Sequence, residues 1–272
     1  MTSQHATGTP RSASTACVVV PCYNEAARLD SAAFRQFLIA HSCVRLLFVD
    51  DGSTDSTLDI LNRLQRGYED RAAVLASKPN HGKGEAVRLG ILHGLEKFRP
   101  EFIGFWDADL ATPLAAIDQF LHIFRIRPDI EMVFGSRVKL LGREVRRRAL
   151  RHYLGRVFAT VVSSMLRLPI YDTQCGAKLF RVEPETERIF ARPFLSKWVF
   201  DVEIIARYLQ LHNGDTQRVE RSIYEYPLET WTDIAGSKVR PRDFATAFWD
   251  VLKIRREYLS RAALRTRSRM LI

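Results

Sequence analysis

The chain has 272 residues, enough for one large α/β domain or two small ones, so a small scaffold held together by disulfides is excluded. Hydrophobic residues make up 46% of the sequence and aromatic residues 10%, which is typical of a globular protein and excludes a disordered chain. The formal net charge of +10 favours an anionic partner, but charge alone does not choose among nucleic acid, anionic lipid and a phosphorylated substrate.

The start of the chain is polar and lacks the basic and apolar segments of a secretory signal. We therefore expect a disordered tail over 1–15 and a cytoplasmic protein. The longest uncharged stretch, 12–24, has thirteen residues, fewer than the ~20 apolar residues that a membrane-spanning helix needs. The four cysteines show no C-x-x-C spacing, so we expect reduced thiols and neither a disulfide framework nor a metal knuckle.

In the first half of the chain, short β-branched runs alternate with helical stretches, a pattern that predicts βαβ units around a parallel sheet. Strands are predicted at 16–20, 44–49, 72–76, 102–106 and 131–134, and helices at about 30–41, 54–66, 82–97 and 113–126. Thr54 and Pro113 are typical of helix starts and mark the second and fourth of these helices.

After Gly135 the alternation stops. Helices are predicted at 149–166, at about 200–211 and from Pro241 to about 259, and strands at 177–182 and 217–223. The helix over 149–166 has a broad apolar face at helical spacing, which is typical of a core helix. We find no internal repeat and no linker that would mark a second domain.

The triplet Asp107-Ala108-Asp109 directly follows the apolar strand 102–106. In extended backbone the side chains of residues i and i+2 point the same way, so both carboxylates are expected to face one cation. Carboxylate oxygens suit a hard cation such as Mg²⁺ or Mn²⁺, which would bridge a nucleotide diphosphate. The alternative is a solvated loop, because D-x-D often arises by chance.

A second acidic motif, Asp50-Asp51-Gly52, follows the strand 44–49. Helix capping by the residues that follow explains part of this motif, but it does not explain Asp51. A carboxylate at this position can accept hydrogen bonds from a base edge or a ribose hydroxyl. The carboxyl ends of parallel strands share one edge of a sheet, so we expect the motifs that follow these strands, the acidic ones and the turns described next, to meet there.

Two further turns follow the first and third strands, P-C-Y-N-E over 21–25 and N-H-G-K-G over 80–84. The second turn places backbone N–H groups and Lys83 at a helix start, which favours a phosphate. It is not a P-loop, because G-x-x-x-x-G-K-[ST] is absent. Taken singly, each of the two is also explained as an ordinary turn.

Taken together and in this order, the motifs resemble the family-two glycosyltransferases of the GT-A fold, on V-V-V-P-C-Y-N-E, F-V-D-D-G-S-T-D-S-T, N-H-G-K-G-E-A and W-D-A-D-L. Four later stretches narrow the resemblance to the polyprenyl-phosphate hexosyltransferases, especially the dolichyl-phosphate β-glucosyltransferases: F-G-S-R, D-T-Q-C-G-A-K-L-F, W-V-F-D-V-E and W-T-D-I-A-G-S-K. The resemblance covers about 16–258. It implies one α/β domain over 16–259, with a mostly parallel nucleotide-sugar half (16–135), a smaller acceptor half (136–259) and a basic tail over 260–272.

The resemblance also implies the residues of the site. The nucleotide sugar would be held by Pro21, Tyr23, Glu25, Asp51, Gly52, Lys83, Asp107 and Asp109, with Asp107 and Asp109 also binding the metal, Mg²⁺ or Mn²⁺. The acceptor would be bound by Arg137, Arg148, Arg151, Ser237 and Lys238. The catalytic residues would be Asp109, Arg137, Gln174, Lys178 and Asp201.

Two departures from related families matter. Polyprenyl-phosphate mannosyltransferases usually read D-A-D-L-Q, and Ala111 replaces the glutamine here, so water would complete the metal shell. The Q-x-x-R-W signature of processive members is absent, which argues against a polymerising synthase. The D-T-Q-C-G stretch favours UDP-glucose as the donor over GDP-mannose.

The expected reaction is an inverting, metal-dependent transfer of a hexose to a polyprenyl phosphate. A phosphate monoester has a second pKa of about 6 and is largely ionised at pH 7, so it needs no general base. The eight basic residues of 137–156 suit such an acceptor. The alternatives are a hydroxyl acceptor, which would need a base such as Asp201, and a non-catalytic module that binds nucleic acid or lipid, which would not need aspartates at strand ends.

A lipid acceptor implies an enzyme that is peripheral on the cytoplasmic membrane face and meets an anionic membrane surface, with no nucleic acid as partner. The predicted last helix combines apolar residues, among them Phe244, Phe248, Trp249, Val251 and Leu252, with basic residues, as an interfacial helix does. The equal alternative is that its apolar face packs on the sheet.

Overall fold

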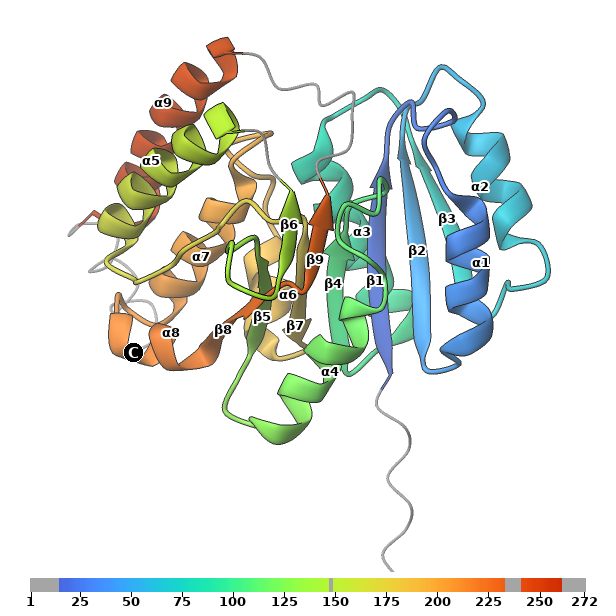
Figure 1. Cartoon of the computed structure of the whole chain (residues 1–272), viewed down its shortest axis with the longest axis horizontal. Helices are drawn as coiled ribbons and strands as arrows, with labels where there is room; N and C mark the ends of the chain where they lie inside the picture. The colour runs from blue at the N-terminus through green and yellow to red at the C-terminus, as the bar shows by residue number, and fades with distance from the viewer. Residues whose placement is uncertain (1–14, 147–148, 233–240, 261–272) are drawn as a thin grey trace, which may run out of the picture.

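The computed structural model describes residues 15–146, 149–232 and 241–260, with the backbone alone described for 146, 149–154 and 241–245 (Figure 1). The strands are β1 (Ala16–Cys22), β2 (Val44–Asp51), β3 (Ala72–Ser77), β4 (Phe102–Trp106), β5 (Met132–Ser136), β6 (Glu144–Arg146), β7 (Ala177–Arg181), β8 (Ile223–Pro227) and β9 (Thr230–Thr232). The helices are α1 (Ser31–Ala40), α2 (Thr57–Gln65), α3 (Lys83–Phe98), α4 (Ala116–Ile126), α5 (Ala149–Leu166), α6 (Pro184–Phe190), α7 (Phe200–Leu211), α8 (Thr216–Ser222) and α9 (Pro241–Tyr258).

Seven strands form one sheet in the order β3-β2-β1-β4-β7-β5-β8. All neighbouring pairs are parallel except those of β7, which runs antiparallel between β4 and β5. The expected mostly parallel α/β sheet is therefore confirmed. Strands from both sides of Gly135 contribute to this single sheet.

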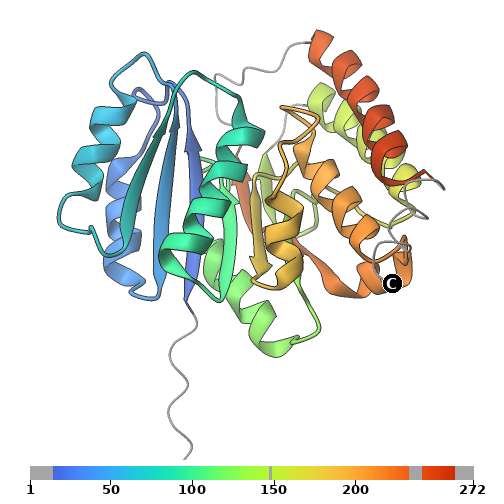
Figure 2. The same cartoon turned by 180° about the vertical axis from the view of Figure 1, so that it is seen from behind.

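Helices cover both faces of the sheet (Figures 1 and 2). Strand residues alternate between two apolar clusters, so that Val18 packs with α1, α2 and α4 whereas its neighbour Val19 packs with α3, α6 and α7. All residues of β4 and β5 are buried, as expected for strands covered on both faces. This packing fixes the ends of the central strands, from which the site is built.

Three sequence predictions need correction. The segment 217–223 is not a strand: it lies mostly in α8, because the Asp215 carboxylate caps that helix at Arg218 N (3.0 Å), and the strand β8 follows. Helix α2 begins at Thr57 and not at Thr54, because Asp55 accepts the backbone N–H of Thr57 (2.9 Å). Helix α4 begins at Ala116, three residues after Pro113.

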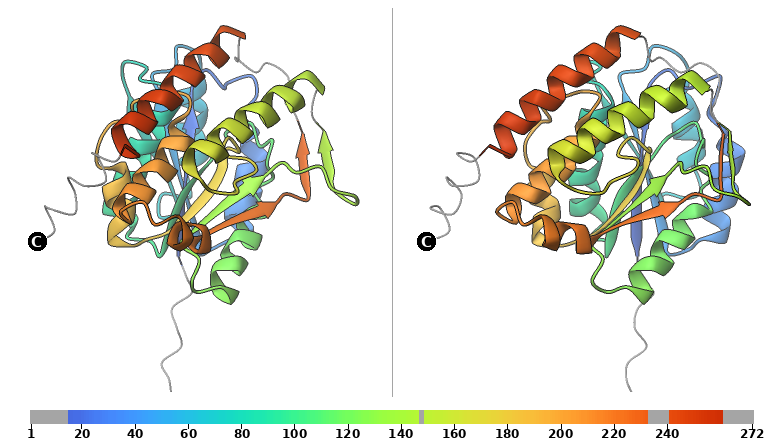
Figure 3. Two further views of the ribbon diagram at one scale, coloured as in Figure 1. Left: turned by 90° about the vertical axis from the view of Figure 1, so that its left-hand side faces the viewer. Right: turned by 60° about the vertical axis from the view of Figure 1, so that its left-hand side comes forward.

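Besides α8 and β8, three further elements were not predicted, α6 and the two strands β6 and β9. These strands pair in parallel into a second small sheet, which projects from the body (Figure 3). Helices α5 and α9 run side by side on the outside of α7 (Figures 1 and 3). None of the described helices has the length and apolar character to cross a membrane.

The apolar surface predicted for the last helix is divided between two environments. Ala247, Val251 and Ile254 of α9 are buried in the core, whereas Phe248 (48% exposed) and Trp249 (64% exposed) face solvent. The helix therefore packs on the body with one face and presents aromatic side chains with another. The side chain of Phe244 lies outside those described.

Candidate active site

The turns that follow β1 and β2 are joined side by side. Asn24 N donates to Ser53 Oγ (3.0 Å), and Thr54 N donates to Asn24 Oδ1 (2.8 Å). Glu25 N donates to Thr57 Oγ1 at the start of α2 (2.8 Å). The predicted convergence of these two motifs at the carboxyl edge of the sheet is therefore confirmed.

Asp51 joins the turn after β2 to the N-H-G-K-G turn that follows β3. Its carboxylate accepts the backbone N–H of His81 (2.9 Å) and of Gly82 (2.7 Å). Gly52, at φ +71°, makes the close approach possible, since a Cβ there would lie 2.9 Å from Asn80 N. Asp51, expected to bind the nucleoside, thus also orients the loop that leads into Lys83.

Lys83 and Asp107 form an ion pair at the end of β4. Lys83 Nζ lies 2.5 Å from Asp107 Oδ1, and both side chains are partly exposed. Burial lowers the pKa of Lys83, but Asp107, Asp201 and Asp109 outweigh it and raise that pKa above its usual value. The ammonium group is therefore firmly charged and surrounded by carboxylates.

We expected Asp107 and Asp109 to face one cation because alternate side chains of extended backbone point the same way. This reason is wrong, since Asp109 does not lie in extended backbone. The chain turns after Asp107, with Leu110 N donating to Asp107 O (3.3 Å) and Leu110 at φ +54°. The two carboxylates are nevertheless close enough to interact: burial first, and then the charge of Asp107, raise the pKa of Asp109. The chain leaves the sheet here because the pairing of β4 with β7 ends at Trp106.

These two carboxylates fit a hard divalent cation. Their mutual repulsion is a cost that a bound Mg²⁺ or Mn²⁺ would offset, and oxygen ligands are those that such ions prefer. In the described part of the chain, no group of three or more His, Cys, Asp or Glu side chains is arranged to hold an ion. The remaining ligands would therefore have to come from a diphosphate and water.

Gly176 is a site residue that sequence reasoning missed. Its carbonyl accepts the N–H of Asp107 (2.9 Å), and a Cβ on Gly176 would lie 1.9 Å from Asp107 Oδ2. The carboxylate of Asp107 thus occupies the space of the missing side chain. The glycine of D-T-Q-C-G was the available signal, but nothing in the sequence connects it with Asp107.

Lys178 and Asp201 form a buried ion pair. Lys178 is fully buried, and its Nζ lies 2.5 Å from Asp201 Oδ1 and 2.5 Å from the carbonyl of Cys175. Burial raises the pKa of Asp201, and the charges of Lys178 and Lys83 partly oppose that effect. Asp201 is thus engaged with a cation, and Lys178 supports it from within the core.

Arg137 is clamped by Asp172. Its Nε and Nη2 donate to the two carboxylate oxygens of Asp172 at 2.6 and 2.7 Å, and the guanidinium lies over the ring of Trp231. The backbone at Asp172 is in turn held by Glu225 of β8. Neither Asp172 nor Glu225 was among the site residues expected from the sequence. The Glu225 carboxylate accepts the backbone N–H of Tyr171 and of Asp172, each at 2.8 Å.

Gln174 lies in the same loop, and its Nε2 is buried without a hydrogen-bond partner among the described residues. The same is true of Ser136 Oγ and Thr173 Oγ1, which neighbour Arg137 and Asp172 in the chain. Because buried polar atoms usually have partners, these three atoms are candidates for contact with a ligand or with water.

The other predicted residues are placed as follows. Pro21 is the last residue but one of β1, and Tyr23 follows the strand directly. Glu25 Oε1 binds Arg28 (2.6 Å), and Glu25 Oε2 is buried without a partner in the described part of the chain. The predicted acceptor residues Arg148, Ser237 and Lys238 lie outside the described residues, as does the side chain of Arg151.

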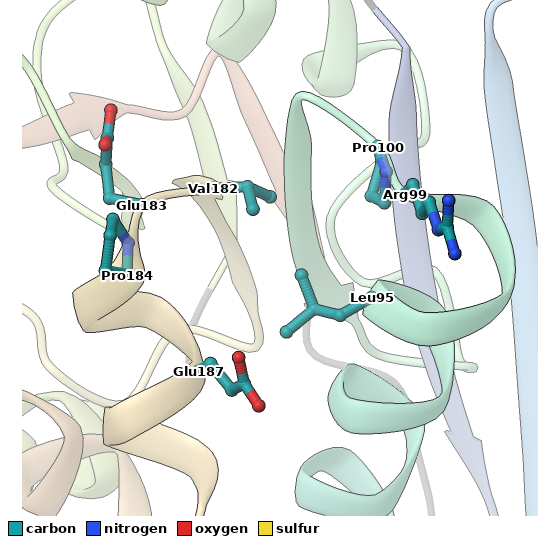
Figure 4. A pocket seen from close by; sticks show the side chains of 7 residues that line it. All are labelled: Leu95, Arg99, Pro100, Val182, Glu183, Pro184 and Glu187. Atoms are coloured by element: carbon teal, nitrogen blue, oxygen red, sulfur yellow. The ribbon is translucent and has the colours of Figure 1, made fainter.

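A pocket lies at the opposite end of α3 from Lys83. Figure 4 shows Leu95, Arg99 and Pro100 on one side of this pocket and, on the other, residues that lie just before or within α6: Val182, Glu183, Pro184 and Glu187. The sixteen residues of α3 span about 24 Å at 1.5 Å per residue, so this pocket is remote from the aspartates. None of the predicted site residues lines it.

Comparisons with known proteins give consistent results. The model of glycosyl transferase family 2 matches residues 17–188. A dolichyl-phosphate beta-glucosyltransferase of Dictyostelium discoideum is 33% identical over 259 residues, covering 89% of this chain and 74% of the relative. One of Mus musculus is 32% identical over 268 residues, covering 90% and 76%.

Among solved structures, glucosyl-3-phosphoglycerate synthase of Mycobacterium tuberculosis in complex with Mn²⁺, UDP-glucose and glycerol 3-phosphate has a TM-score of 0.62 and 18% identity. The match covers 89% of this chain and 80% of that chain. At this identity the likeness concerns the fold.

Proposed function

The chain belongs to glycosyl transferase family 2, and on that premise we propose that it transfers glucose from UDP-glucose to a dolichyl-type polyprenyl phosphate. The family and the GT-A-type fold expected from the motifs are confirmed. Two relatives that share about a third of their residues with most of this chain are named for dolichyl phosphate and glucose, which supports both the sugar and the acceptor. The observation that carries the proposal is the cluster of Lys83, Asp107 and Asp109 at the carboxyl edge of the sheet.

On the donor side, the turns after β1, β2 and β3 form a continuous rim. Asn24 binds the turn after β2, and Asp51 binds the turn after β3, so that the rim is fixed before any ligand arrives. We assign the nucleoside to this rim and the diphosphate to Lys83, Asp107 and Asp109. A cation on the two carboxylates would neutralise the charge that develops on the leaving diphosphate.

On the acceptor side, the attacking group is a phosphate oxyanion. It forms a bond to the anomeric carbon while the bond from that carbon to the UDP oxygen breaks, and the configuration inverts. No proton has to be removed, which agrees with an Asp201 that is bound to Lys178 and not free to act as a base. A hydroxyl acceptor would require such a base.

Arg137 is the described cation best suited to the acceptor phosphate. A guanidinium has five N–H donors, and the bonds to Asp172 use two of them. The unpartnered atoms of Ser136, Thr173 and Gln174 lie on the same two segments and would contact the sugar or the phosphate. Arg148 and Arg151 remain our proposal for the rest of the phosphate site.

We further propose that the enzyme acts as a peripheral protein at the cytoplasmic face of a membrane. Its acceptor is embedded in lipid, and α9 presents Phe248 and Trp249 beside the exposed Lys253. Aromatic and basic side chains on one helix are typical of an interfacial helix.

The test is a transfer assay with purified protein, UDP-glucose labelled in the sugar, polyprenyl phosphate and Mg²⁺ or Mn²⁺. Label should pass into the organic phase as a glycolipid that mild acid hydrolyses. The matched controls are GDP-mannose as donor and the corresponding polyprenol as acceptor. Transfer to the polyprenol at the same rate would favour the hydroxyl-acceptor alternative, and absence of transfer from either donor would refute the proposal.

A further inference from the structure

The loop between β5 and β6 ends in two exposed leucines. Leu141 is fully exposed and Leu140 is 48% exposed. Arg143 N donates to Leu140 O (3.2 Å) and Gly142 has φ +78°, so the loop closes in a tight turn with the leucines at its tip. Single exposed leucines are common on protein surfaces, but two consecutive ones at the tip of a turn are unusual, because turns are normally built from polar residues and glycine.

The base of this loop is held in place. Arg143 pairs with Glu229 (3.2 Å), and Glu144 N donates to the carbonyl of Glu229 (2.9 Å). Val145 of β6 is buried, and β6 pairs with β9 in the small sheet that projects from the body (Figure 3). The leucines are therefore presented outward on an ordered support.

The loop begins at the proposed acceptor site. Leu140 lies three positions after Arg137, and extended chain spans at most about 3.6 Å per residue, so their Cα atoms lie within about 11 Å of each other. Arg137 is fixed by its two bonds to Asp172. A surface that binds Leu140 and Leu141 therefore lies close to the guanidinium of Arg137.

We propose that this tip, residues 139–143, inserts into a lipid bilayer that carries anionic headgroups. Leu140 and Leu141 would enter the apolar interface, while the exposed Lys139 would meet the headgroup phosphates. Insertion would hold Arg137 near the headgroup plane, where the phosphate of a lipid-anchored acceptor lies. The inference rests on the proposed function and assigns the membrane contact to a loop distinct from α9.

A bilayer fits this surface better than a protein partner does. A stable protein interface buries about 800 Å² on each side, far more than the tip of one turn can offer. Two leucines next to a lysine instead match the apolar and anionic layers of a membrane surface.

The test uses the full chain and co-sedimentation with vesicles of phosphatidylcholine containing 30% phosphatidylserine, an ordinary choice of composition for about physiological surface potential. The variant is Leu140→Ser combined with Leu141→Ser. The matched control is Ile39→Ser combined with Ile126→Ser, because these exposed residues lie on α1 and α4. We expect the tip variant to bind vesicles at least about tenfold more weakly, and the control variant to bind like the wild type.

A second measurement separates this proposal from the proposed function. With a short-chain, water-soluble polyprenyl phosphate the tip variant should keep the wild-type rate, whereas with vesicle-embedded acceptor its rate should fall. Vesicle binding unchanged by the tip substitutions overturns the membrane contact while leaving the proposed function intact. A wild-type dimer that becomes monomeric in the tip variant also overturns it, since the tip would then contact a second copy. If no polyprenyl phosphate accepts glucose, the proposed function fails, whatever the vesicles show.

Discussion

The Nζ of Lys83 lies 2.5 Å from Oδ1 of Asp107, so the start of α3 and the end of β4 share an ion pair at the centre of the proposed donor site. In this arrangement the ammonium group neutralises a carboxylate that we assign to the metal. The same lysine is our candidate for contact with the donor diphosphate. We therefore expect the metal to compete with Lys83 for the carboxylate of Asp107.

Substitution Lys83→Met should separate these two roles. Without the competing ammonium, the affinity of the protein for Mn²⁺ in the absence of nucleotide should rise several-fold, because the two carboxylates lose their internal counter-ion. The affinity for UDP-glucose should fall, because a positive charge near the diphosphate is lost. Mn²⁺ titration followed by electron paramagnetic resonance measures the first quantity, and calorimetry measures the second. Weaker Mn²⁺ binding in the variant would contradict the proposed competition.

Substitution Asp109→Asn should lower the rate of metal-dependent transfer by several orders of magnitude without unfolding the protein. Burial and Asp107 raise the pKa of Asp109, so its neutral replacement removes a repulsion and should not lower the melting temperature. Transfer rates with and without EDTA, together with thermal melting, check both expectations. A variant that transfers glucose at the wild-type rate would remove Asp109 from the metal site.

The sequence predicted the convergence of the motifs because each motif follows a strand, and parallel strands end at one edge of the sheet. It could not predict which groups pair there. Asp51 binds backbone N–H groups thirty residues away, and Asp107 depends on the space left by Gly176. The first contact follows from the parallel pairing of β2 with β3, and the second from β7, which is inserted antiparallel beside β4; local periodicity does not encode that insertion. The error at α8 has a different, local cause: the start of this helix is fixed by a cap at Asp215, a signal that was outweighed by the strand pattern of the residues that follow.

Substitution Asp201→Asn should destabilise the protein by about 3–5 kcal/mol, because it leaves the buried ammonium of Lys178 without its counter-ion. Loss of transfer in this variant alone would therefore not identify a general base. The double variant Asp201→Asn with Lys178→Met removes both charges and should recover most of the stability. Recovery of transfer in the double variant supports a phosphate acceptor, whereas a stable double variant without any transfer would show that the reaction needs one of the two side chains and would contradict a purely structural role for the pair. Chemical denaturation and the transfer assay provide the two measurements.

Substitution Glu225→Gln should act on the acceptor side at a distance. Burial raises the pKa of Glu225, and its two backbone donors only partly oppose that effect. A carboxyl whose folded-state pKa is raised holds its proton more tightly in the folded protein than in the unfolded chain. Its stabilising contribution is therefore complete below the ordinary value of 4.5 and is lost as the pH rises through the folded-state pKa. The melting temperature of the wild type should therefore decrease as the pH rises through this range. The Glu225→Gln variant should lack the part of the decrease that comes from Glu225.

The same substitution should raise the acceptor KM more than it lowers kcat, because a glutamine offers only one oxygen to the two N–H groups of Tyr171 and Asp172. The loop that clamps Arg137 would then lose one of its supports. The KM for UDP-glucose, whose proposed site lies on other strands, serves as the internal control. Equal changes in both KM values would indicate general damage to the fold and not a positioning role for Glu225.

Substitution Gly176→Ala tests whether the space beside Asp107 matters for the donor site. A Cβ at Gly176 would lie 1.9 Å from Asp107 Oδ2, much closer than atoms can approach, so the carboxylate would have to move. The move breaks the geometry of the metal pair while leaving both aspartates in the sequence. We therefore expect Mn²⁺ affinity and transfer to fall together. The double variant Gly176→Ala with Asp107→Ala should bind Mn²⁺ no more weakly than Asp107→Ala alone, because the alanine at 176 acts through a carboxylate that is already gone. Additive losses of Mn²⁺ affinity in the double variant would show that the alanine disturbs the site by another route, and Mn²⁺ titrations of the wild type and the three variants decide between the two outcomes.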